Sequence, residues 1–112
     1  MKLDSTPGDG FLTLELNGRL DTLSAPGVEA AFDAHIEAGS TRLILNMNNV
    51  HFINSAGLRV LMTTAKKIAR ENGKLVFCKL PPEVQSVFEI GGLLSIFLIA
   101  DDEPAARDMV KA

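Results

Sequence analysis

Residues 43–70 read LILNMNNVHFINSAGLRVLMTTAKKIAR, and this stretch contains the change from strand to helix that decides the fold. Residues 43–47 are almost continuously apolar, which predicts an interior strand covered on both faces. The asparagine pair at 48–49 predicts a turn. From residue 58 onward the apolar side chains recur at intervals of three and four, which predicts a long amphipathic helix that stops near residues 72–73. The inner face of this helix is expected to carry Leu58, Leu61, Met62, Ala65 and Ile68.

Two strands are expected before this stretch. Leu12, Leu14 and Leu16 occupy every second position of segment 11–16, and this period of two indicates a strand with one well-buried face. Segment 6–10, TPGDG, predicts a turn before that strand, because proline and glycine favour turn backbones. Residues 1–4 are expected to pair with it as a short first strand.

A helix is expected between the second strand and the interior strand. Asp21 or Ser24 is expected to cap its first turn, because short polar side chains accept the free backbone N–H groups there. Gly39 is expected to end the helix. Its inner face comprises Val28, Ala31, Phe32 and Ile36.

The C-terminal third of the chain continues the alternation of strand and helix. Residues 74–79 predict a strand, and Pro81 or Pro82 fits the first turn of the helix that follows. Residues 95–100 predict the last strand, and Asp101 or Asp102 is expected to cap a final helix. The inner faces of these two helices comprise Val84, Val87, Phe88, Ala106, Met109 and Val110.

The predicted order of elements is β, β, α, β, α, β, α, β, α. Strands that alternate with helices form a largely parallel sheet, because each helical crossover returns the chain to the same edge of the sheet. The first two strands add an antiparallel pair. We therefore predict a single α/β domain over residues 1–112, in which a mixed sheet of four or five strands packs against four helices.

Composition excludes several classes of function. The formal net charge is −3, with eleven Lys and Arg against fourteen Asp and Glu, whereas a nucleic-acid binder needs a basic face. His35 and His51 lack companions at metal-ligand spacing, so no metal site is predicted. Cys78 is the one cysteine, lies in an apolar run and is expected to be a buried, unreactive side chain of a reducing compartment. Neither a signal peptide nor a membrane-spanning run is recognisable, so we expect a cytoplasmic protein without direct membrane insertion.

Two motifs resemble those of a known family. Segment 46–58, NMNNVHFINSAGL, is similar to the signature of STAS domains, the anti-sigma factor antagonist family. Segment 18–21, GRLD, resembles the Gly-x-Leu-Asp element of the same family. The predicted order of strands and helices agrees with the family from the first strand to the last helix. The resemblance therefore covers nearly the whole chain and implies a STAS-type sheet and helix arrangement.

The resemblance also implies a binding protein without catalytic residues or a cofactor. In this family the unmodified antagonist binds an anti-sigma factor that is also a serine kinase, which frees the sigma factor. Phosphorylation by that kinase reverses the binding, and a serine phosphatase resets the cycle; whether the domain also forms a homodimer stays open. The position that matches the family's phosphoacceptor is Ser55. The implied partner-binding surface comprises Asp21, Asn54, Ser55, Ala56, Gly57, Leu58 and Arg59.

The predicted start of a helix at Ser55 offers a physical reason for this role. Free N–H groups and the positive end of the helix dipole support a phosphate there. That phosphate adds about −1.5 to −2 charge, which is expected to weaken partner binding. Gly57 is expected to let a partner backbone approach closely. Taken without the resemblance, Ser55 is better explained as a plain helix cap than as a phosphoacceptor.

Two positions differ from the family's usual pattern. Asn54 stands where the family commonly has Asp, and Ala56 stands where a second Ser is frequent. The loss of the acid at position 54 keeps a second function open. In that alternative the chain is a STAS adaptor subunit of a lipid-transport or stress-sensing complex, and Ser55 is never phosphorylated.

Overall fold

The computed structural model describes all of residues 1–112 and contains one five-stranded sheet. The strands lie side by side in chain order, and β1 is antiparallel to β2 whereas the other neighbouring pairs are parallel. The mixed sheet and its four helices confirm the predicted α/β class. The strands are β1 (Lys2–Pro7), β2 (Leu12–Leu20), β3 (Arg42–Ile53), β4 (Lys74–Cys78) and β5 (Leu98–Ala100).

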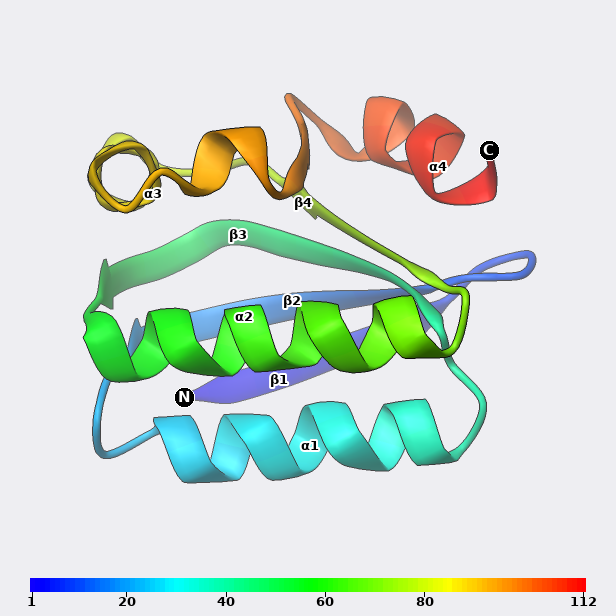
Figure 1. Cartoon of the computed structure of the whole chain (residues 1–112), viewed down its shortest axis with the longest axis horizontal. Helices are drawn as coiled ribbons and strands as arrows, with labels where there is room; N and C mark the ends of the chain where they lie inside the picture. The colour runs from blue at the N-terminus through cyan, green and yellow to red at the C-terminus, as the bar shows by residue number, and fades with distance from the viewer.

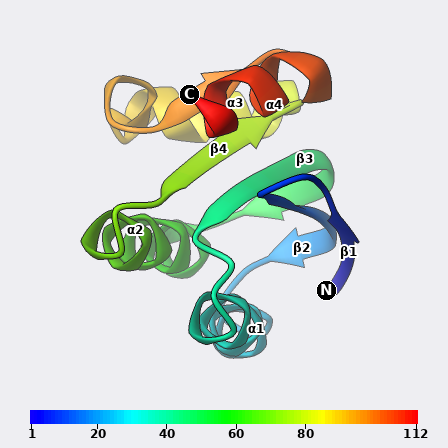
Figure 2. The same ribbon diagram turned by 90° about the vertical axis from the view of Figure 1, so that its right-hand side faces the viewer.

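Helices cover both faces of this sheet. The larger core cluster joins one face of the sheet to α1, α2 and α3, and the smaller cluster joins the other face to α4. Figures 1 and 2 show α1 and α2 lying side by side along the sheet. No helix is both long and apolar enough to cross a bilayer. The helices are α1 (Ala25–Glu37), α2 (Ser55–Arg70), α3 (Pro82–Ile90) and α4 (Glu103–Lys111), and a 3-10 turn covers Leu93–Ser95.

The turn predicted at Asn48 and Asn49 is wrong, because β3 continues without interruption to Ile53. The side chain of Asn49 instead bonds to the neighbouring strand, where its Nδ2 donates to Asn17 Oδ1 at 2.9 Å. The pairing of β2 with β3 shifts register just beside this bond. The asparagines therefore connect two strands, and the longer β3 delivers the chain directly to the start of α2.

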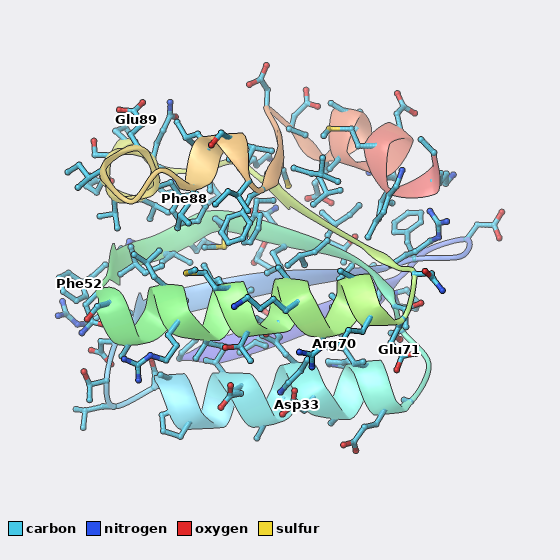
Figure 3. All side chains as sticks on the ribbon, viewed as in Figure 1. Asp33, Phe52, Arg70, Glu71, Phe88 and Glu89 are labelled. Atoms are coloured by element: carbon cyan, nitrogen blue, oxygen red, sulfur yellow. The ribbon has the colours of Figure 1, made fainter.

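The two outer strands differ in length from the prediction. The first strand reaches Pro7 rather than residue 4, since it pairs with β2 along its whole length. The last strand is only three residues long, and Phe97 before it turns into the core. There Phe97 contacts the rings of Phe77 and Phe88 at centroid distances of 4.7 and 5.6 Å. Figure 3 shows Phe88 directed from α3 toward the sheet. The sequence placed Phe97 in the last strand, whereas in the structure its ring belongs to the aromatic cluster of the core.

One face of α2 also differs from the prediction. Met62, expected in the core, is 38% exposed, whereas Thr64, which lies outside the predicted apolar face of the helix, is 1% exposed. The predicted core positions Leu61 and Ile68 are buried. The core-facing stripe of α2 is therefore rotated toward Thr64, and this rotation leaves Met62 at the surface midway along the helix.

Candidate functional site at the start of α2

The start of α2 is defined by Asn54 and not by Ser55. Asn54 has an extended backbone, and its Oδ1 accepts the N–H of Ala56 at 3.0 Å and that of Gly57 at 3.2 Å. An amide oxygen is a favoured cap because it satisfies N–H groups that have no partner within the helix. The interpretation of Ser55 as a plain helix cap is therefore wrong.

Ser55 is the first residue of α2, and its side chain is exposed. Because Asn54 does the capping, the Ser55 hydroxyl takes part in none of the side-chain hydrogen bonds of the structure. Ser55 lies in a shallow depression of about 380 Å³ on the outer side of the helix. The other residues that line this depression are Leu58, Arg59, Met62, Thr63 and Lys66.

Gly57 packs in the interior of the domain, against residues of the same chain. It is buried, and a Cβ atom at this position would lie 2.4 Å from the carbonyl oxygen of Leu20 and 3.1 Å from Cγ1 of Ile53. We expected a partner backbone to approach Gly57; the backbone that approaches it is the end of β2 in the same chain. Glycine at this position lets the first turn of α2 sit directly against the ends of β2 and β3.

Asp21 organises the loop that follows β2. Its Oδ1 accepts the N–H groups of Leu23 and Ser24, both at 3.1 Å, and Arg19 Nε lies 3.4 Å from its Oδ2. The hydrogen bond from the Ser24 N–H lowers the pKa of Asp21 below its usual 3.8, and the hydrogen bonds from Arg19 and Leu23 contribute less to this shift. Partial burial of the carboxylate acts in the opposite direction but does not cancel the shift. Ser24 precedes α1, but its side chain makes no capping bond to that helix. Asp21 therefore fixes the turn before α1 and does not cap the helix itself.

The loops after β2 and β3 meet beside Ser55. Asn54 N–H donates to the carbonyl oxygen of Leu20 at 3.3 Å, and Asn54 Nδ2 donates to Thr22 Oγ1 at 3.4 Å. Parallel neighbouring strands end at the same edge of a sheet, which is why these two loops come together. The structure thus brings Asp21 to the same end of the domain as Asn54 and Ser55.

Sequence reasoning missed three residues of this region. The Arg19 guanidinium lies 4.2 Å from the ring centroid of Phe52, a distance typical of a cation–π contact. Figure 3 places Phe52 beside the first turn of α2. Leu23 is 92% exposed. Leu23 could have been noticed as an apolar residue that no strand or helix period assigns to the core.

The comparisons with known proteins agree with this architecture. The sequence model of the STAS domain family matches residues 2–106. The chain belongs to the STAS domain family. A candidate anti-sigma factor antagonist of Bordetella bronchiseptica, BtrV, is 41% identical over 99% of this STAS domain and 96% of its own length. The anti-sigma F factor antagonist of Paenibacillus polymyxa is 30% identical over 84% and 81% of the two chains.

A solved structure extends the agreement to three dimensions. The crystal structure of a candidate anti-sigma factor antagonist from Thermotoga maritima superposes with a TM-score of 0.93 at 22% identity. The match covers 98% of this STAS domain and 95% of that chain. The fold is therefore shared, and the relatives of this domain bear the name of anti-sigma factor antagonists.

Proposed function

We propose that this STAS domain is an anti-sigma factor antagonist that binds an anti-sigma factor with serine kinase activity. The kinase phosphorylates Ser55, which releases the antagonist, and a serine phosphatase restores the binding form. In this cycle the domain is a cytoplasmic binding partner and performs no chemistry of its own. Its contact surface is the depression at Ser55 together with the loop that holds Asp21.

The observation that carries this proposal is the free hydroxyl of Ser55. A phosphoacceptor must be reachable by the kinase and must not be required to hold the fold together. Ser55 meets both conditions, because it is exposed and because Asn54 satisfies the N–H groups of the first turn. The positive end of the α2 dipole also favours an anion at this position.

The charges beside Ser55 explain how a phosphate would act. Arg59 lies four residues after Ser55, so the two side chains share one face of α2 and line the same depression. A phosphate of about −1.5 to −2 charge would pair with Arg59 and withdraw it from the partner. Asn54 is neutral, so no carboxylate at the cap opposes the phosphate. The departure from the family's Asp therefore lowers the electrostatic cost of modification.

The test combines a phosphorylation map with binding measurements. The protein is incubated with each serine kinase anti-sigma factor of the source bacterium and ATP, and the phosphate is located by mass spectrometry. We expect a single phosphate on Ser55 and none on the S55A variant. A phosphate at another residue contradicts the assignment.

Partner affinity is then compared between the unmodified protein and the S55D variant by calorimetry. We expect S55D to bind the anti-sigma factor at least about tenfold more weakly, which corresponds to about 1.4 kcal/mol. S86D is the matched control, because Ser86 is also an exposed helical serine but lies in α3. If S55D binds as tightly as S86D, the phosphorylation switch is refuted and the constitutive adaptor function takes its place.

A further inference from the structure

Leu23 is the most exposed of the large apolar side chains of this domain, at 92%. A single exposed leucine is ordinary on a protein surface and by itself needs no explanation. Leu23 differs from an ordinary surface leucine in two respects. Its loop is fixed by hydrogen bonds on both sides, and it stands beside the surface that contains Ser55.

The hydrogen bonds hold the backbone of Leu23 in one conformation. The Asp21 carboxylate accepts the N–H of Leu23 and that of Ser24. Ser24 Oγ accepts the N–H of Asp21 at 3.0 Å and donates to the carbonyl oxygen of Arg19 at 2.7 Å. The turn is therefore ordered before any partner arrives, so binding through Leu23 costs little additional conformational entropy.

The position of Leu23 joins it to the Ser55 surface. Thr22, the residue before it, accepts the hydrogen bond from Asn54, the residue before Ser55. On the Leu23 side of this contact a second shallow depression of about 340 Å³ is lined by Met1, Arg19, Asp21, Leu23 and Ser24. A partner that covers Ser55 thus lies close enough to cover Leu23 as well.

The charges on this side of the domain indicate what the partner presents. Arg19, Arg59 and Lys66 are exposed here, although the domain as a whole has a net charge of −3. Asp21, the one acid among the residues that line the two depressions, is engaged with Arg19 and with backbone N–H groups. We therefore expect the contact surface of the partner to be acidic around an apolar hollow large enough for a leucine side chain.

We propose that Leu23 is an apolar anchor that inserts into such a hollow of the anti-sigma factor, and that Asp21 is the positioning residue that holds it outward. This inference rests on the proposed function, since the anti-sigma factor is the partner. The anchor contributes affinity in the unmodified state, and Ser55 contributes the switch. A few side chains that fill well-packed, desolvated pockets near the centre of an interface carry most of its binding energy.

The test measures the affinity of L23A, L23M and I90A for the purified anti-sigma factor by calorimetry. We expect L23A to raise Kd about 30-fold, which is about 2 kcal/mol at 1.4 kcal/mol per tenfold, and L23M to restore most of the affinity. I90A is the matched control, because Ile90 is 88% exposed at the end of α3 and is expected to leave Kd within about twofold. The melting temperature reports whether each variant is folded, and L23A should leave it unchanged because Leu23 buries almost nothing in the free domain.

Each outcome separates the anchor from the switch. If L23A binds as well as I90A, the anchor is refuted whatever S55D does. If L23A weakens binding and S55D does not, the anchor stands and the phosphorylation switch fails. If the unmodified domain binds none of the anti-sigma factors of its bacterium, both proposals are overturned.

Discussion

Replacing Gly57 by alanine tests how the start of α2 is positioned. The added Cβ would lie 2.4 Å from the carbonyl oxygen and 2.7 Å from the Cγ of Leu20, where ordinary contacts are 3.4–4 Å. That carbonyl oxygen cannot simply turn away, because it accepts the N–H of Asn54. The first turn of α2 must therefore move outward by about 1 Å, and the hydrogen bond that joins the two loops must lengthen.

The magnitude follows from two opposing effects. Forcing an extra carbon into a packed site typically costs about 1–3 kcal/mol. Alanine recovers up to about 1 kcal/mol relative to glycine in a helix. Because the closest contact is with a backbone oxygen, we expect a net loss of about 2 kcal/mol in the free energy of unfolding. With about 2.1 cal/mol/K of unfolding entropy for each of 112 residues, the melting temperature falls by about 8 °C.

The chain supplies a matched control for this variant. Gly27 is the third residue of α1, as Gly57 is the third residue of α2, but no atom lies within 4 Å of a Cβ built on Gly27. We expect G27A to stabilise the domain by about 0.5 kcal/mol, because alanine restricts the unfolded chain. Urea unfolding followed by circular dichroism measures both variants. Equal stabilities of G57A and G27A would refute the close packing of α2 on Leu20.

Three further predictions concern single side chains. T64V should raise the free energy of unfolding by about 1 kcal/mol in urea titrations, because the buried Thr64 hydroxyl has no hydrogen-bond partner. T63V, at a half-buried position, is the control and should change the free energy of unfolding by less than about 0.5 kcal/mol. A loss of stability in T64V would contradict this reasoning. The Cys78 thiol, whose pKa burial raises to about 11, should react with iodoacetamide at about pH 8 only after unfolding, and equal rates in the folded and unfolded protein would show that it is accessible. Because the folded-state pKa of Asp21 is below 3.8, its bonds stabilise the fold above that value and this contribution is lost as the pH falls through the folded pKa. The stability difference between the unmodified protein and D21N should therefore be largest near neutral pH and shrink toward about pH 3, and a difference that grows on acidification would be inconsistent with the lowered pKa.

The class of the fold and the place of the candidate site could both be predicted from local sequence patterns. Apolar periods of two and of three to four separate strands from helices, because these periods reflect the geometry of the isolated elements. The motif at residues 54–58 located the helix start, and the family resemblance picked out Ser55. Local features such as the final cap were also predictable, since Asp102 accepts the N–H of Ala105 within its own first turn.

Which side chains the fold uses, and which it leaves free, depends on the tertiary structure. Asn54 and Ser55 are both good caps in sequence, and the choice of Asn54 depends on the path by which β3 enters α2. Gly57 is required by the end of β2, which is far away along the chain. Met62 was assigned to the core but is exposed, and Leu23, assigned to no element, is the most exposed of the large apolar side chains. Such facts depend on contacts between distant segments, and a local pattern holds no information about which distant segment will be its neighbour.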